Sequence, residues 1–241
     1  LAIHLDPNAN TQKSINKQTD LSPIISTDEN FDLNLFLLKH CQVDDIKNIY
    51  SHELSLYPTQ KASYFGAQNE FIASARLDNL LSCYIGMLVV CSIDAPVLFV
   101  ANDHEEVGSV SSSGAEGSFL QNTLQRVNGD YEKFVQTCRR SLMVSLDNAH
   151  AIHPNFPSMH DLAHAPKLGG GVVVKSNSNQ KYASNSKTIA RFLNVASSLG
   201  EKTQNFVSRS DIGCGSTIGP ITAAKLGIAV LDLGVPTLAM H

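Results

Sequence analysis

The chain has 241 residues, of which 43% are hydrophobic and 17% are charged, and its formal net charge is -4. This length accommodates one large domain, or a medium domain with a smaller one, and the composition is that of a globular protein rather than a disordered or collagen-like chain. The slight acidic excess excludes the basic surface that phosphate backbones require, so nucleic acid is not an expected partner.

The cysteines and the apolar runs bear on the location of the protein. The five cysteines are odd in number and follow no CxxC spacing, so we expect neither a disulfide framework nor a structural zinc cluster, and a reducing, cytoplasmic location. The longest apolar run, 83–93, is about half the ~20 residues of a membrane helix, and no charged-then-apolar leader opens the chain. We therefore expect no membrane association, and a chain that is cut at both ends, at Leu1 and at His241.

The first 65 residues are polar and rich in turn-forming residues, which predicts short strands and loops. Apolar spacing predicts a helix over 31–41 and a strand over 49–56. From Gln68 onward, apolar strands alternate with amphipathic helices, a pattern typical of a layered α/β domain with a substantially parallel sheet. The sequence thus predicts two domains, residues 1–67 and 68–241.

The strands predicted in the second domain are rich in Val, Ile and Leu, as in strands that are covered on both faces. They are 96–102, 141–146, 171–175 and 228–233. The predicted helices are 78–90, 117–138 with a break at Gly129, 187–199 and 220–226.

Four acidic residues lie at the ends of these elements. Asp78 opens a helix, Glu105 and Glu106 follow one strand, and Asp147 follows another. Ligands of open α/β sheets bind beyond the carboxyl ends of the strands, where such groups can converge and where four like charges need cations. Two divalent metals, with zinc as the leading candidate, would neutralise the cluster and activate a water molecule. The adjacent glutamates suit a division of roles, one binding a metal and the other accepting a proton from the water.

Structural explanations of the same carboxylates stay open on the residues alone. The glutamate pair also fits a solvated loop, Asp78 an N-cap of its helix, and Asp147 a turn residue at a strand end.

The histidine pairs and the glycine-rich segments favour structural roles. The pairs His150/His153 and His160/His164 have helical spacing for zinc but lack the glutamate of H-E-x-x-H, so we interpret them as loop or surface residues. The segments 169–171 and 213–217 lack the ending of a phosphate loop and indicate tight turns.

Six segments around these carboxylates resemble, in order, segments of the aspartyl aminopeptidase family. They are Arg76-Leu77-Asp78-Asn79, Glu105-Glu106-Val107-Gly108-Ser109, the run from Asp147 to Asn155, Tyr182-Ala183-Ser184-Asn185, the run from Cys214 to Pro220, and the run from Leu231 to His241. The first five residues, 1–5, resemble the start of a segment in the family's inserted dimerisation domain. The resemblance covers essentially the whole chain and implies a three-layer zinc-exopeptidase-like domain with a central mixed sheet, preceded by part of a smaller β-rich dimerisation domain.

The resemblance also implies a metal site for two zinc ions. Asp78 would bridge the metals, Glu106 and His241 would complete the protein ligands of the first, and Asp147 would bind the second. Glu105 would be the general base. The second metal of the family also needs a histidine from a segment upstream of the dimerisation domain, and no residue of this chain corresponds to it.

The substrate and the assembly are implied in the same way. Lys175 matches a lysine that favours an acidic first residue of the peptide, and His4 matches a histidine lent to the active site of a neighbouring subunit, so a homo-oligomer built from dimers is expected. His104 stands where the family usually has Asn, and Asn148 where it usually has Met.

The function implied is that of a metal-dependent aminopeptidase removing N-terminal Asp or Glu from peptides. Two alternatives remain at this point: a non-catalytic assembly or scaffold subunit with the same fold, and a related zinc amidohydrolase of different specificity, because the specificity rests on Lys175 alone.

Overall fold

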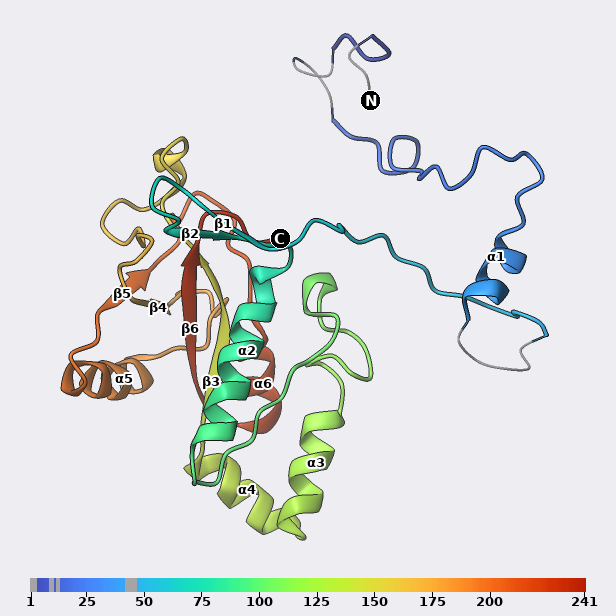
Figure 1. Cartoon of the computed structure of the whole chain (residues 1–241). Coiled ribbons are helices and arrows are strands. Elements are labelled where there is room, and N and C mark those ends of the chain that lie inside the picture. Colours follow the sequence, from blue (N-terminus) through green and yellow to red (C-terminus); the bar gives the residue numbers. More distant parts are fainter. Residues whose placement is uncertain (1–3, 9–10, 12–13, 42–46) are drawn as a thin grey trace. The chain divides into compact units, whose positions relative to one another are not determined.

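The computed structural model describes residues 4–8, 11, 14–41 and 47–241, and the chain divides into two compact units, Leu1–Tyr57 and Pro58–His241 (Figure 1). In its described residues, the first unit contains one helix, α1 (Leu33–His40), which begins where the Asp32 carboxylate accepts a hydrogen bond from the Leu35 N–H. The helix predicted over 31–41 is thereby confirmed. The strand predicted over 49–56 is wrong, because this segment is exposed and has no partner strand among the described residues, so alternation alone did not form a sheet.

A four-stranded mixed sheet organises the second unit. Its strands are β3 (Leu142–His150), β4 (Val172–Lys175), β5 (Thr203–Phe206) and β6 (Ala229–Thr237), in the spatial order β3-β6-β4-β5. The pairs β3/β6 and β4/β5 are parallel, whereas β4 and β6 are antiparallel. The mixed sheet expected from the family resemblance is confirmed, and the substantially parallel pairing expected from the pattern of elements holds for two of its three strand pairs, β4/β6 being the antiparallel one.

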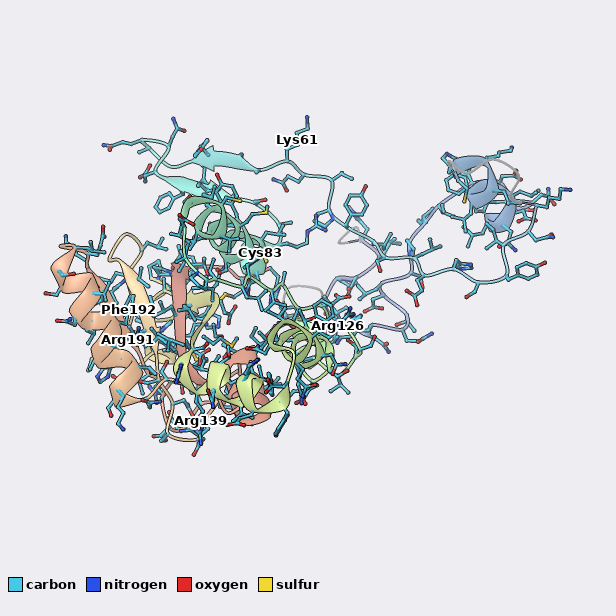
Figure 2. The ribbon with its side chains drawn as sticks, turned by 90° about the horizontal axis from the view of Figure 1, so that it is seen from below. Lys61, Cys83, Arg126, Arg139, Arg191 and Phe192 are labelled. Atoms are coloured by element: carbon cyan, nitrogen blue, oxygen red, sulfur yellow. The ribbon has the colours of Figure 1, made fainter. Side chains whose placement is uncertain are left out.

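Helices cover both faces of this sheet. Leu231 and Leu233 of β6 pack with Ile189 and Phe192 of α5 (Ser186–Ser198), while Asp232 between them points to the other face, where α6 (Ile218–Leu226) begins. In both views α5 lies on one side of β6, and α2 (Leu77–Ser92) and α6 lie on the other (Figure 1, Figure 2). One apolar cluster therefore lies between β6 and α5, and the opposite face, which carries Asp232, combines polar groups with a second apolar cluster of Ala149, Val173, Tyr182 and Phe206.

The remaining elements connect these layers. Helices α3 (Phe119–Asn128) and α4 (Tyr131–Arg140) are separated at Gly129, whose φ of 79° ends the first helix, so the predicted break is confirmed. A hairpin of β1 (Ser63–Phe65) and β2 (Phe71–Ala73) precedes α2, and two 3-10 turns are η1 (Glu105–Val107) and η2 (Pro157–Met159). Over the described residues, every helix is too short or too polar to cross a membrane.

In the second unit, one predicted strand is absent and one observed strand was not predicted, for opposite reasons. The apolar segment 96–102 is not a strand; Val97, Leu98 and Phe99 are exposed, and the Phe99 ring lies against Gly86 of α2. Conversely, the polar strand β5 was not predicted, because an edge strand is held by its ladder to β4 and needs no apolar run. In both cases the partner strand, rather than the local composition, decided the structure.

Candidate metal centre

One cavity of the second unit gathers the predicted site residues. Its volume is about 400 Å³, and its lining includes all five residues predicted to converge and the predicted substrate-binding lysine. They are Asp78, Glu105, Glu106, Asp147, His241 and Lys175. The predicted convergence is confirmed, while the individual roles stay predictions. His4 belongs to the first unit, where it is exposed.

The start of α2 is fixed between the sheet and the C-terminal segment. Asp78 and Asn79 have non-helical backbone angles, and the peptide bond between them is cis. The Asp78 N–H donates to the carbonyl oxygen of Met240 at 3.2 Å, and the Asn79 amide donates to the carbonyl of Leu146 at 3.0 Å. These two bonds bring Asp78 next to both β3 and His241, which are far from it in the sequence.

The glutamate pair lies in the tight turn η1. His104 before the turn and Gly108 after it both have positive φ, and the Ser109 N–H donates to the His104 carbonyl at 2.7 Å. This geometry reverses the chain within a few residues, so the adjacent side chains of Glu105 and Glu106 both reach the cavity.

Asp78, Glu106 and His241 form a group suited to a cation. One potential ligand atom from each of the three lies within 4.8 Å of the others, and His241 Nε2 is 3.4 Å from Glu106 Oε2. Asp78 Oδ1 is buried without a hydrogen-bond partner, an arrangement that costs free energy unless a cation or another donor meets it. Two carboxylates and one imidazole match the donor set of an open zinc site, so these residues fit the metal.

Asp147 has a different partner, because Lys175 Nζ lies 2.8 Å from its Oδ2. The two residues lie on β3 and β4, on either side of Gly234 in β6. A Cβ added at Gly234 would lie 2.9 Å from Lys175 Cε, so only glycine leaves the lysine side chain room to cross β6. Asp147 is also inside β3 rather than after it, which corrects the sequence prediction.

The charges of the cavity are unbalanced. Burial raises the pKa of Asp78 to about 7, and the neighbouring Asp147 and Glu106 reinforce the shift. Burial likewise raises the pKa of Glu105, with added repulsion from Asp147 and Glu106. Burial alone would raise the pKa of Asp147 as well, but the charge and hydrogen bond of Lys175 hold it below the ordinary value. The cluster thus binds protons that a divalent cation would displace.

The two predicted metal positions differ in the number of donor side chains that the described residues offer. Within the part of the chain that the structure describes, the first position is the one group of three donors. The second position has Asp78 and Asp147, and Asp147 is already neutralised by Lys175.

Sequence reasoning assigned no role to several residues of the cavity wall. The Tyr182 ring lies 5.3 Å from Lys175 Nζ, and its hydroxyl is 3.5 Å from Cys214 Sγ. His150 and His160 also line the cavity, although the sequence favoured loop or surface positions for both. Tyr182 and Cys214 lie inside two of the family-like segments, and this position is the signal that could have identified them.

A mixed α/β domain whose cavity combines carboxylates with an imidazole has the donor groups that metallohydrolase sites use. The family model described as "Aminopeptidase I zinc metalloprotease (M18)" matches residues 1–241. The chain belongs to this M18 family of zinc metallo-aminopeptidases.

The sequence relatives of this chain include proteins of pseudomonads. The chain is 48% identical over 251 residues to a probable M18 family aminopeptidase 2 of Pseudomonas putida (strain GB-1), covering 100% of this chain and 58% of the relative. A probable M18 family aminopeptidase 2 of Pseudomonas fluorescens (strain SBW25) is 48% identical over 249 residues with the same coverage. The chain therefore spans somewhat over half the length of these relatives.

Solved structures share the fold. The chain matches a cryo-EM structure of the Ape4 and Nbr1 complex with a TM-score of 0.81 and 35% identity, covering 100% of this chain and 52% of that one. It matches the structure of the S. cerevesiae mApe1 dodecamer with a TM-score of 0.65 and 27% identity, covering 76% and 43% respectively.

Proposed function

We propose that this chain supplies most of the active site of a two-metal zinc aminopeptidase that removes N-terminal acidic residues from peptides. The observation that carries the proposal is the single cavity that combines a three-donor group, a further carboxylate and a buried lysine. Metal binding, proton transfer and recognition of an acidic side chain each have a separate group there.

Asp78, Glu106 and His241 would hold the first metal, and Asp78 with Asp147 would contribute to the second. When bound, such cations supply Lewis acidity to the scissile carbonyl and lower the pKa of a water molecule. The bridging role of Asp78 is supported by its buried, unpartnered Oδ1 and by its proximity to both Glu106 and Asp147.

Glu105 would act as the general base. It lines the cavity but is not part of the three-donor group, so its carboxylate stays free for proton transfer. Its raised pKa, caused first by burial, suits a group that accepts a proton from the attacking water and then donates it to the leaving amine. The structure of the turn η1 supports this separation of roles between adjacent glutamates.

Lys175 would recognise the acidic side chain of the substrate. Its ammonium group is buried and lies on the cavity wall, where a carboxylate would form a charge-assisted hydrogen bond. An acidic substrate would share this lysine with Asp147. The same ion pair supports a second candidate, a zinc peptidase or amidohydrolase of broader specificity, if Lys175 serves only to neutralise Asp147.

The assembly proposed for the whole protein is a homo-oligomer built from dimers, in which His4 reaches the active site of a neighbouring subunit. The solved relative described as a dodecamer supports an oligomer. We also propose a cytoplasmic location, which agrees with five free cysteines. Light scattering and cell fractionation of the tagged protein test these two proposals.

The decisive experiment is a zinc titration followed by peptide hydrolysis. Because the second position has only two carboxylates, we expect one tight zinc per chain, and slow cleavage of an Asp-initiated peptide in preference to a Leu-initiated peptide. Glu105→Gln serves as the control for contaminating peptidases. Equal cleavage of both peptides would favour broader specificity, and failure to bind zinc would exclude the proposal.

A further inference from the structure

One further carboxylate, on the face of the sheet where α6 begins, lies outside the metal centre. Asp232, in the middle of β6, is 0% exposed. Its Oδ2 accepts a hydrogen bond from the Ala183 N–H at 2.6 Å, and its Oδ1 accepts one from the Thr217 hydroxyl at 2.6 Å. A buried carboxylate is costly unless such bonds satisfy it, and hydrogen bonds to a charged acceptor are among the strongest in proteins.

The two donors belong to two separate loops that form one wall of the cavity. Ala183 follows Tyr182 in the loop 181–185, and Thr217 ends the loop 213–217 and caps α6. The loops also bond each other, because the Ser216 hydroxyl donates to the Lys181 carbonyl at 3.1 Å. One carboxylate thus holds two segments that are distant in the sequence.

A carboxylate is the group that meets both donors at once. Each of its oxygens accepts one bond, whereas an amide has only one oxygen acceptor. The carboxylate also lies against the first turn of α6, where unpaired N–H groups favour a negative charge. Gly219 permits this contact, since a Cβ there would lie 2.5 Å from both carboxylate oxygens.

We propose that Asp232 is a positioning residue that clamps the loops 181–185 and 213–217 together and so keeps Tyr182 beside Lys175. The Tyr182 ring lies 5.3 Å from Lys175 Nζ, and Ala183, the next residue, is bonded directly to the clamp. This inference rests on the proposed function for its effect on substrate, but the clamp itself can be measured without activity.

The test removes one arm of the clamp with Thr217→Val, which keeps the shape and deletes the hydroxyl. Alkylation of the chain with iodoacetamide, followed by mass spectrometry of each cysteine peptide, reports the opening of the 213–217 loop through Cys214. Cys83 of α2 is similarly half-buried and serves as the internal reference. We expect Thr217→Val to speed alkylation of Cys214 by about tenfold or more and that of Cys83 by less than about twofold.

Two further variants separate clamping from general loss of structure. Thr217→Ser restores the hydroxyl and should return Cys214 to within about twofold of the parent rate, while Thr123→Val, the same change at a partly exposed position of α3, should leave it unchanged. The proposal is overturned if Cys214 is not accelerated in Thr217→Val, if Cys83 is accelerated equally, or if Thr217→Ser behaves like Thr217→Val.

Kinetics then test the effect on the pocket. In the zinc-loaded chain, Thr217→Val should raise KM for an Asp-initiated peptide by about tenfold and change kcat by less than about twofold, since it displaces a binding wall rather than the proton-transfer group. An unchanged KM together with faster alkylation of Cys214 would refute the positioning role. If the parent chain cleaves no peptide, the proposed function fails, and the alkylation rates still decide whether Asp232 clamps the loops.

Discussion

Neighbouring carboxylates in this cavity have different surroundings, and the difference governs what each can do. Glu106 pairs with His241 and joins the three-donor group, whereas Glu105 is held apart from it with a pKa raised by burial. Asp147 is the exception among the acidic groups, because Lys175 compensates its charge at 2.8 Å.

The two glutamates are expected to respond oppositely to substitution. Glu106→Ala removes a proposed ligand and should weaken zinc binding by more than the roughly 10- to 100-fold typical of residues behind the ligands. Glu105→Gln should leave zinc content nearly unchanged and abolish hydrolysis. Metal analysis after dialysis against a zinc buffer measures both, and the reverse pattern would mean that the roles are exchanged.

Lys175→Met should reduce selectivity for acidic peptides, because it deletes the buried positive charge and keeps much of the side-chain volume. The ratio of kcat/KM for Asp- and Leu-initiated peptides is the measurement, and Lys187→Met on exposed α5 is the matched control. If both peptides lose activity equally, Lys175 acts by neutralising Asp147 alone.

Asp78 should make the metal-free chain less stable as the pH rises. Its pKa is about 7 in the folded chain against 3.8 for an ordinary aspartate side chain, so the folded state binds the extra proton between these values and loses that advantage towards pH 7. Asp78→Asn stays uncharged, so its Tm relative to the parent should increase from pH 4 to pH 7. A constant difference in Tm across this range would contradict the raised pKa of Asp78.

At the scale of elements, the close approach of β3, β4 and β6 builds the site. Gly234 is the point at which Lys175 crosses β6, with the Asp147 carbonyl only 2.8 Å from the position of an added Cβ. Both neighbours are part of packed strands and cannot move freely. The residue without a side chain is therefore as necessary to the ion pair as the charged residues are.

Gly234→Ala should consequently destabilise the chain by about 1–3 kcal/mol, the usual effect of overpacking a core. Chemical denaturation measures the free energy of unfolding. Gly213→Ala is the matched control, because an added Cβ there meets no atom within 4 Å. Equal stability of the two variants would show that the strands separate easily at this point.

At the scale of the molecule, the second unit carries an exposed apolar stripe on α2. Its side chains have helical spacing and are mostly exposed: Leu80, Tyr84, Met87 and Leu88. The exposed segment 97–99 adds three more apolar residues, and Phe99 contacts the same helix at Gly86. A surface of this kind commonly marks an interface or promotes aggregation.

The purified 241-residue chain should therefore self-associate with increasing concentration, and the double substitution Met87→Lys and Tyr84→Lys should reduce this. Multi-angle light scattering measures the mass. Gln136→Lys, at an exposed position of α4, controls for the added charge. A parent chain that stays monomeric at high concentration would show that the apolar stripe on α2 does not mediate self-association.

The sequence by itself determined the local features and the list of candidate groups. The helices, the break at Gly129 and three of the four strands of the mixed sheet follow from apolar spacing and turn chemistry that lie within a few residues. The order of the family-like segments pointed to Asp78, Glu105, Glu106, Asp147 and His241 before any geometry was known. What these signals share is that each is encoded in a short stretch of chain.

Only the tertiary structure decided which of these groups are partners. Lys175 and Asp147 are 28 residues apart in the sequence, and Asp232 and Ala183 are 49 apart. No pattern in the sequence predicts either contact. Neighbouring strands also decided the secondary structure of two segments. The polar segment β5 pairs with β4 and is a strand, whereas the apolar segment 96–102 has no partner strand in the described part of the chain and is not one. The physical reason is that ion pairs, buried hydrogen bonds and β-ladders depend on groups brought together by folding, whereas periodicity reports only what each segment can bury.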